Sequence, residues 1–486
     1  MMRIRYGLGL TGSAIAALMQ PAQAETGTWR FHADHVLGTS LDLAVVAGKP
    51  LAAALAIDAA RTEIARLDRI LSAWRSDSEL MALNAASTLS VSPELFAVIA
   101  LCEKMRDTTG GAYSARIGRL LEACQNSAKD SAALAARIEA ANLRLDAGTR
   151  TITRPRDVVF AVDGLAKGYI IDRALAAARC VPGVNGVMVD IGGDLACWGS
   201  APDGKSWRIG VVDAANPADN APHLTHLLVS GQAVATSGRS GRGPLTVSPL
   251  TGARLDHVAY ATAVAGTAAE ADALATAFSV LPPRQAIALA DRLPDVAARI
   301  VTRDGDTLTS SRWQCAGAPN PVSVAQAPRA IAQGSGGWPT GFGLNIEYEV
   351  PKVSAGTYHN PYVAIWITDE NRTLIRTLLV LGKETRWKEE NYIYWRRFGR
   401  NDTKLVDSVS RPTRAPGQYN IKWDGLDDAG KNVPQGKYVL NIEAAREKGG
   451  HTVQRLELTL GADGAVVEAK PDGEIGRVRA TYGRSQ

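Results

Sequence analysis

One lysine of this sequence follows a glycine at the point where an apolar strand is expected to turn into a helix. The run from Phe160 to Tyr169 reads FAVDGLAKGY, with Gly164 at the turn and Lys167 near the start of the helix. Backbone N–H groups at such a turn, together with a lysine, favour an anionic group such as phosphate. Strand-glycine-helix corners are also common without any ligand, so this run alone leaves both interpretations open.

A second segment places a carboxylate and a hydroxyl one helical turn apart. The run from Glu270 to Thr276 reads EADALAT, and the i, i+4 spacing puts Asp272 and Thr276 on one face of a helix of small apolar residues. Such hard oxygen atoms suit Mg²⁺, with room beside them for substrate and water. The alternative is structural: an acid that interacts with the helix dipole and a threonine that bonds its own backbone.

Eight short motifs follow one another along the first two thirds of the chain. They are Leu37-Gly38-Thr39, Ser72 to Asn84, Thr109 to Ser114, Gly164 to Gly168, Val189 to Leu195, Ala235 to Gly238, Pro249 to Gly252 and Ala271 to Thr276. In this order and at these spacings they resemble the FAD:protein FMN transferase family, the ApbE-like proteins, over residues from about 30 to 315. An ordered series is far more specific than any one motif, so it favours the metal interpretation of Asp272 and Thr276.

The resemblance implies a definite reaction. Enzymes of this family cleave the pyrophosphate of FAD and pass the FMN phosphoryl group to a threonine hydroxyl of an extracytoplasmic flavoprotein, with release of AMP. The chain would then be a Mg²⁺-dependent transferase, with FAD as substrate and a flavoprotein that exposes a Thr motif as partner. Phosphoryl transfer needs neutralised charge and a positioned nucleophile, which a metal ion and a few fixed donors supply.

The resemblance also implies site residues, by match to the family motifs. Mg²⁺ would be held by Asp272, Thr276 and the backbone carbonyl of Gly164, while Lys167 would face the FAD phosphates. Trp74 and Tyr113 offer planar faces for stacking, with placement in the core as the rival interpretation for both. The positions that match the FAD pocket are Leu37, Trp74, Ala112, Tyr113, Ser114, Ala161, Lys167 and Leu245.

Departures from the family pattern occur at positions that bear on chemistry. Where relatives carry His-x-x-Asp-Pro-x-Thr-Gly, this chain has Leu245 for the His and Ser248 for the Asp. The usual Phe-Asp-x-Thr becomes the run from Tyr113 to Arg116, and an Asp ahead of the lysine motif becomes Ala161, with Asp163 as a nearby substitute.

The family His is a candidate base for the incoming threonine hydroxyl, so its replacement leaves the base open. His257 and Lys167 are candidates for a catalytic role, and His223 and His226 are as eligible as His257 from sequence. Two other functions therefore stand beside the transferase. The first is an FAD-binding protein or FAD pyrophosphatase that yields FMN and AMP, and the second is a catalytically weakened periplasmic scaffold that acts through its C-terminal domain.

The N-terminus has the features of a secretory signal peptide. Arg3 and Arg5 precede a mostly apolar stretch, and Ala22 and Ala24 flank a cleavage point before Glu25. The apolar stretch is shorter than the roughly 20 residues that span a bilayer, so a membrane anchor is disfavoured. We expect residues 1–24 to be removed and the mature protein to lie in the periplasm without spanning the membrane.

The rest of the chain divides into an α+β domain and an all-β domain. Residues 25–315 mix periods, with helices expected over Ala52 to Leu71, Pro93 to Arg106 and Thr267 to Val280 between apolar strands, which suits the ApbE-like fold of sheets and packed helices. Residues 316–337, rich in Gly, Pro and Ser, are predicted to form a flexible linker. Residues 338–486 hold six or seven short strands, several with alternating apolar and polar positions, which indicates an Ig-like β-sandwich. The expected strands are Phe342 to Val350, Tyr362 to Ile367, Leu374 to Leu381, Tyr419 to Trp423, Tyr438 to Ala444 and Leu456 to Leu460.

The composition excludes several classes of protein. Hydrophobic residues make up 46% and charged residues 21%, and the net charge is +5, as in an ordinary globular protein. A sequence pI near 8.9 is only mildly basic, so charge gives no reason to expect nucleic acid as a partner. Five cysteines lack metal-binding spacing and do not indicate a zinc site; the spacing leaves their disulfide pairing open.

Overall fold

A computed structural model describes residues 27–125, 130–211, 225–238, 246–313, 317–318, 338–352, 360–382, 390–401, 406, 410–411, 413–447 and 449–484. The predicted signal peptide, Leu245, His223 and Cys315 lie outside the described residues, as does the predicted linker apart from residues 317–318. The four cysteines that the structure describes, Cys102, Cys124, Cys180 and Cys197, are free thiols.

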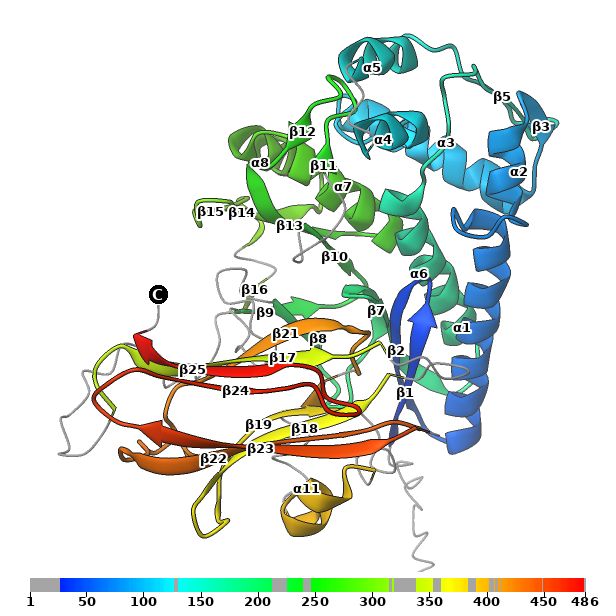
Figure 1. Ribbon diagram of the computed structural model, residues 1–486. Helices are drawn as coiled ribbons and strands as arrows, with labels where there is room; N and C mark the ends of the chain where they lie inside the picture. The colour runs from blue at the N-terminus through cyan, green and yellow to red at the C-terminus, as the bar shows by residue number, and fades with distance from the viewer. Residues whose placement is uncertain are drawn as a thin grey trace, which may run out of the picture.

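An antiparallel sheet of eight strands forms the centre of the N-terminal domain (Figure 1). Successive neighbours in the sheet are joined by antiparallel hydrogen-bond ladders throughout. In spatial order the strands are β1 (Gly27–Val36), β2 (Thr39–Ala47), β6 (Val184–Ile191), β7 (Asp194–Gly199), β10 (Ala233–Gly238), β13 (Val258–Ala265), β14 (Ala297–Thr302) and β15 (Thr307–Thr309).

Helices cover one face of this sheet and a smaller sheet lies against the other. Alternation along β2 sends Leu43 and Val45 into the core beneath the helices, while Ala44 and Val46 join a second cluster with Trp207 on the opposite face. The small sheet consists of β8 (Trp207–Val211), β9 (Thr225–Val229) and β16 (Gly317–Ala318). Both faces of the central strands are therefore buried.

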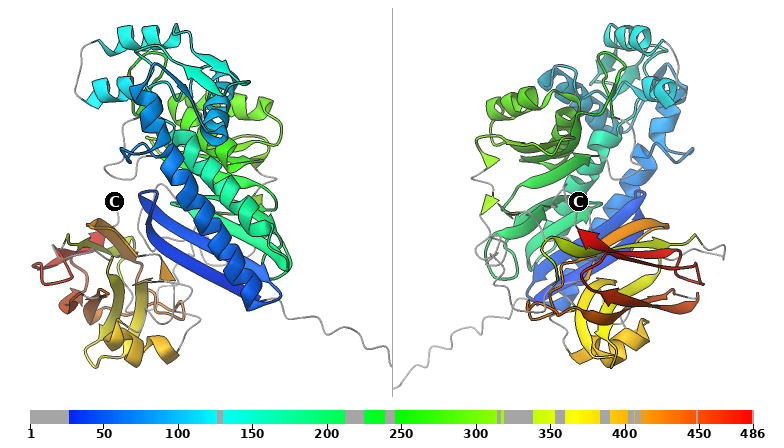
Figure 2. Two further views of the ribbon diagram at one scale, coloured as in Figure 1. Left: turned by 90° about the vertical axis from the view of Figure 1, so that its right-hand side faces the viewer. Right: turned by 60° about the vertical axis from the view of Figure 1, so that its left-hand side comes forward.

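Three long helices make up the covering layer. Figure 2 shows α1 (Pro50–Leu71) running alongside α6 (Asp163–Arg179), and α6 in turn packs on α7 (Ala268–Val280). Sequence signals set their ends, because α1 begins at a proline and the Thr267 side chain caps the Glu270 amide of α7. The helices predicted from periodicity are confirmed as α1, α7 and α3 (Pro93–Thr108).

Shorter elements extend the domain beyond the sheet. Within the described part of this domain the shorter helices are α2 (Glu79–Ala85), α4 (Gly118–Gln125), α5 (Ser131–Glu139) and α8 (Pro283–Arg292). Two small antiparallel sheets join β3 (Thr88–Ser90), β5 (Thr151–Thr153) and β4 (Arg144–Asp146), and β11 (Thr246–Val247) with β12 (Arg254–Leu255).

The C-terminal domain is a sandwich of two sheets that share one apolar core. Inward residues such as Ile346 of one sheet and Ile365 and Ile442 of the other belong to a single cluster around the buried Trp423. One sheet has the order β21 (Gly417–Trp423), β17 (Phe342–Val350), β25 (Val478–Arg484), β24 (Ala465–Ala469). The other has the order β20 (Ser410–Arg411), β19 (Leu374–Leu381), β18 (Tyr362–Asp369), β22 (Gly436–Ala445), β23 (His451–Leu460), and a short helix, α11 (Tyr392–Arg397), packs on its outer face. The predicted α+β domain followed by an all-β domain is confirmed.

Candidate active site

Helices α6 and α7 approach each other closely at Gly168. A Cβ atom on Gly168 would lie 2.1 Å from the carbonyl oxygen of Ala268, so only glycine fits at this crossing. The Gly168 amide donates to Oδ2 of Asp272 at 3.2 Å. The close crossing therefore brings the lysine motif of α6 against the carboxylate-bearing face of α7.

A second acid of α6 fixes the start of α7. The carboxylate of Asp172 accepts the backbone amides of Ala268 at 2.8 Å and Ala269 at 3.0 Å, and so satisfies free donors at the positive end of the helix dipole. Burial raises the pKa of Asp172 to about 6, although the two amide bonds act in the opposite direction. Asp172 thus sets the position of α7 relative to α6.

The predicted metal ligands converge at this crossing. A Cβ atom on Gly164 would lie only 2.9 Å from Oγ1 of Thr276, which places the first turn of α6 against the third turn of α7. Asp272, one turn before Thr276, is almost fully buried and points to Gly168. The structure therefore brings Gly164 together with Asp272 and Thr276, although Gly164 lies more than 100 residues before them in the sequence.

Lys167 lies next to this group and is paired with a buried acid. Its Nζ is 2.6 Å from Oδ2 of Asp194, at the start of β7. The other oxygen of Asp194 accepts the Thr236 amide at 2.9 Å. Burial opposes the charged form of Lys167, but Asp194 and Asp272 outweigh it and raise the pKa of the ammonium. Lys167 is therefore a stable positive charge.

The site holds more acidic side chains than basic ones. Burial, and next the charge of Asp194, raises the pKa of Asp272, against the opposing effects of Lys167 and the Gly168 amide. Burial likewise raises the pKa of Asp163. Three carboxylates face one ammonium, and a divalent cation would neutralise the excess. Carboxylate, hydroxyl and carbonyl oxygens are the ligands that Mg²⁺ prefers, so the residues present fit this ion.

The turn that carries Leu37 lies beside the turn that leads to Asp194. Leu37 has φ +51° and the next residue, Gly38, has φ +78°, so the β1–β2 hairpin turns through left-handed backbone at a non-glycine residue. The Gly192 amide donates to the carbonyl of Ser40 at 3.0 Å. The structure therefore places this predicted FAD-pocket residue near the strand end that presents Asp194.

The two predicted aromatic contacts occupy opposite environments. Tyr113 is 2% exposed, and its hydroxyl lies 3.2 Å from Sγ of Cys102, so core placement describes it. Its ring edge would be 3.4 Å from a Cβ atom on Gly164, so it supports the site from beneath. Trp74, between α1 and α2, is 91% exposed and leaves its ring open for stacking.

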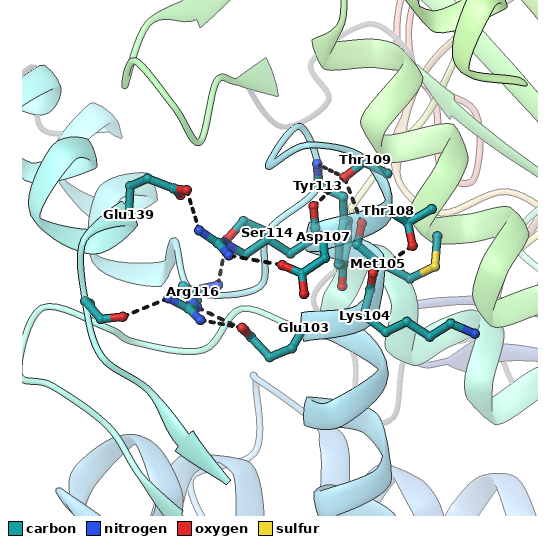
Figure 3. A network of polar contacts seen from close by, with 12 residues as sticks. Glu103, Lys104, Met105, Asp107, Thr108, Thr109, Tyr113, Ser114, Arg116 and Glu139 are labelled. Carbon is teal, nitrogen blue, oxygen red and sulfur yellow. Dashed lines mark hydrogen bonds and ion pairs between the residues drawn. The ribbon is translucent and has the colours of Figure 1, made fainter. Parts of the chain in front are cut away.

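Buried contacts explain the departure at Arg116 (Figure 3). Its guanidinium pairs bidentately with Glu103 of α3, with Nε 3.0 Å from Oε1, and donates to the carbonyl of Ala141 at 3.0 Å. The Arg116 amide bonds Oγ of Ser114 at 3.3 Å. Arginine at this position therefore ties the loop after α3 in place and has no charge left over for a ligand.

A backbone contact also joins the loop after α3 to the segment that leads into α6. Ala112 is buried with Tyr113, and the Ala161 amide donates to the carbonyl of Ala115 at 2.8 Å. Asp163 stands two residues later, at the first position of α6, where burial raises its pKa and the nearby Lys167 ammonium offsets part of that rise. It is the carboxylate that the chain offers near the position of Ala161.

His257 does not reach this site. Its Nε2 lies 3.0 Å from the carbonyl of Leu281, the residue that caps the C-terminal end of α7. Leu281 follows Asp272 by nine residues, which corresponds to about 13 Å along the helix. The structure therefore gives His257 a contact at the far end of α7, and the hypothesis that it replaces the family His is not supported.

Sequence reasoning missed three residues that organise the site. Asp194 and Asp172 were visible in the motifs, but only the fold shows their partners. Asn84 was visible as well: its side-chain amide bonds both the carbonyl of Phe160 at 2.9 Å and the amide of Phe160 at 2.8 Å, and so fixes the segment that enters α6. An acid after a Gly-Gly turn and an Asn after a helical Leu were the only sequence signals.

Comparison with known proteins identifies the family of this arrangement. The ApbE family matches residues 37–300, more than half of the chain. This chain belongs to the ApbE family. A second match, to a family described as a predicted periplasmic protein (DUF2271), covers residues 343–477.

Curated relatives of this ApbE protein are FAD:protein FMN transferases. The one from Klebsiella pneumoniae (strain 342) is 26% identical over 265 residues, which cover 49% of this chain and 74% of the relative. The one from Treponema pallidum (strain Nichols) is 28% identical over 316 residues, which cover 56% and 84%. The family resemblance found from the motifs is thus confirmed, at modest identity.

Solved structures show the same fold. The apo flavinyl transferase ApbE of Pseudomonas stutzeri superposes with a TM-score of 0.53 at 22% identity, over 60% of this chain and 99% of that one. The ApbE protein of Thermotoga maritima gives 0.52 at 23%, over 60% and 100%. Among the described residues of this chain, no helix is both long and apolar enough to cross a membrane.

Proposed function

We propose that this ApbE protein is a Mg²⁺-dependent FAD:protein FMN transferase that attaches FMN from FAD to a threonine of a periplasmic or membrane-bound flavoprotein and releases AMP. The observation that carries the proposal is the convergence of Gly164, Asp272 and Thr276 beside Lys167 at the α6–α7 crossing. The names of the relatives support FAD as the substrate and a protein as the acceptor. Periplasmic location is supported by the family matched at residues 343–477 and by the predicted signal peptide.

The chain's own residues supply most of what the reaction needs. Asp272, Thr276 and the Gly164 carbonyl would hold Mg²⁺, which when bound neutralises charge on the pyrophosphate. Lys167 presents an ammonium that stays protonated because Asp194 and Asp272 face it, and it would contact the phosphate oxygens. Trp74 presents an open ring for an aromatic part of FAD. No residue is assigned as the acceptor of the threonine proton, because His257 lies elsewhere and Leu245 replaces the family His.

The lack of an assigned proton acceptor for the threonine makes FAD hydrolysis the second candidate function. Water can take the place of the threonine as nucleophile, so the same metal and lysine would split FAD into FMN and AMP without a protein acceptor. The observation that favours this candidate is the replacement of the family His and Asp by Leu245 and Ser248. Both candidates use the same α6–α7 site, and they differ only in what receives the phosphoryl group.

One experiment separates the candidates. The purified protein is incubated with FAD and Mg²⁺, with and without an acceptor domain that bears a flavinylation threonine, and AMP release and in-gel flavin fluorescence are followed. The transferase predicts fluorescence on the acceptor; AMP without labelled acceptor favours the hydrolase. Asp272→Asn keeps an acceptor for the Gly168 amide but removes the charge, and should abolish both signals. Glu270→Gln removes a charge from the same helix and should retain them.

A further inference from the structure

Asp194 is a buried acid of the site to which the proposed function assigns no contact with the metal or the substrate. It is the first residue of β7, directly after the Gly192-Gly193 turn, and its side chain is 4% exposed. Both of its oxygens are engaged, one with the Thr236 amide and one with Nζ of Lys167 at 2.6 Å. The carboxylate is therefore held in place by two partners within the protein, one on the sheet and one on helix α6.

The pair joins a fixed group to a flexible one. Thr236 belongs to β10, an interior strand of the eight-stranded sheet, so its amide anchors Asp194 to the middle of that sheet. Lys167 has a flexible four-carbon stem, and 31% of its side chain is exposed to solvent. An ammonium carries three N–H donors, so the bond to Asp194 leaves donors that can face a phosphate. The anchored acid thereby fixes a charge that would otherwise move among rotamers.

We propose that Asp194 is a positioning residue of the transfer reaction: it holds the Lys167 ammonium in one place facing the FAD pyrophosphate, so that the positive charge is already set when charge develops in the transition state. This role rests on the proposed function. Fixed charges act strongly in catalysis because they need no reorganisation at the moment of reaction. The Asp194 carboxylate acts only through Lys167 and does not itself touch the substrate.

The sign of the expected effect is unusual and distinguishes this role from a binding role. Asp194 is negative and lies close to where the phosphates would bind, so it repels FAD in the ground state. Removal of its charge should leave FAD affinity unchanged or increase it, while the less constrained Lys167 stabilises the transition state less well. Affinity and turnover should therefore move apart.

The test is a double-mutant cycle of Asp194→Asn, Lys167→Met and the double variant. Asparagine keeps an oxygen for the Thr236 amide, and the partly exposed Lys167 ammonium still has Asp272 nearby, so Asp194→Asn should still fold, which thermal unfolding checks. We expect kcat for AMP release to fall about tenfold or more in Asp194→Asn. FAD affinity, measured from flavin fluorescence without Mg²⁺, should stay within about threefold or tighten. In the Lys167→Met background the Asp194→Asn change should have almost no further effect, because residues that act as one unit are not additive.

A second readout needs no turnover. Acetic anhydride labels free amines, and the rate at which Lys167 is labelled in metal-free protein is measured by peptide mass spectrometry. Loss of the ion pair in Asp194→Asn should raise that rate severalfold, because the paired ammonium is held in its charged form. Asp190→Asn, which removes a carboxylate that bonds the Gly193 amide of the same turn, should raise the rate less.

Several results would overturn this role. Additive effects of the two substitutions on kcat would mean that Asp194 acts independently of Lys167. A large loss of FAD affinity with unchanged kcat would assign Asp194 to substrate binding, and an unchanged labelling rate would show that it does not hold the ammonium. A wild-type protein that releases no AMP would overturn the proposed function and this role with it, whereas an active wild type with an equally active Asp194→Asn overturns this role alone.

Discussion

Gly168→Ala is a one-carbon change at the crossing on which the site depends. The added Cβ would lie 2.1 Å from the carbonyl oxygen and 2.6 Å from the amide nitrogen of its α7 neighbours, Ala268 and Ala269, where ordinary contacts need more than 3.4 Å. Both neighbours are backbone atoms that cannot rotate away, so α6 and α7 must separate by about 1 Å or more. Overpacking of this kind costs about 1–3 kcal/mol. The separation also pulls the Gly168 amide from Asp272, now at 3.2 Å.

Differential scanning calorimetry and AMP release measure the two consequences. A loss of 1–3 kcal/mol corresponds to a fall in Tm of roughly 2–12 °C for a domain of this size. The Mg²⁺ concentration for half-maximal activity should rise at the same time, because Gly164 and Asp272 move apart. Gly266→Ala is the matched control, since a Cβ there meets nothing within 4 Å. A Gly168→Ala protein as stable and as active as Gly266→Ala would refute the helix-crossing account.

Three further perturbations test other parts of the structure. Burial raises the pKa of Asp172 to about 6, so the folded protein binds a proton that the unfolded chain has released above about pH 4. The free energy of unfolding should therefore fall as pH rises from about 4 to 6, and urea titrations should show that Asp172→Asn loses this fall. Parallel pH profiles of the wild type and Asp172→Asn would contradict the account. Glu103→Gln should lower the free energy of unfolding by roughly 3 kcal/mol, because Arg116 is left as a buried charge without its partner. Glu139→Gln, which removes the more exposed partner of Arg106, should lower it by less than about 1 kcal/mol. Equal losses of stability in the two variants would argue against the buried pair. Trp74→Ala should raise KM for FAD severalfold with unchanged Tm, because the ring is exposed; unchanged KM would remove Trp74 from the pocket.

The elements that position the site could be predicted because their patterns are local. The helical period of the segment before Leu71 and the proline and threonine signals at helix starts correspond to α1, α3 and α7. In the C-terminal domain the alternation from Phe342 to Val350 and the run from Leu374 to Leu381 match β17 and β19 residue for residue. Strands β24 and β25 were missed, and so was helix α11, a segment dense in aromatic and basic residues that covers a sheet face.

The partners within the site could not be predicted because they join distant segments. Lys167 and Asp194 are 27 residues apart and on different kinds of element, and no spacing rule links a helix to a strand end. The same holds for Asp172, whose carboxylate reaches amides 96 and 97 residues further along. The motif resemblance identified which residues matter, but burial decided their environment. Tyr113 is buried beneath the site, and Trp74 is exposed. His257 contacts the far end of α7.

Two aspartates between β21 and β22 show the same difference between local contacts, which can be predicted, and distant contacts, which cannot. Asp427 accepts the amides of Ala429 and Lys431, and Asp428 accepts the Thr377 amide at 3.1 Å. Turn chemistry alone favours this use of aspartate over a calcium site, because short side chains bond nearby backbone amides. The contact of Asp428 with a neighbouring strand, in contrast, needs the fold.

The most direct test of the central claim is the mass of the acceptor after reaction. An acceptor domain and its Thr→Val variant are incubated with FAD, Mg²⁺ and either the wild-type protein or Asp272→Asn, and intact-protein mass spectra are recorded. We predict that the acceptor gains the mass of one FMN phosphoryl ester only with wild-type protein, Mg²⁺ and the threonine present. An acceptor of unchanged mass while AMP is released would contradict transfer and identify the α6–α7 site as that of an FAD hydrolase.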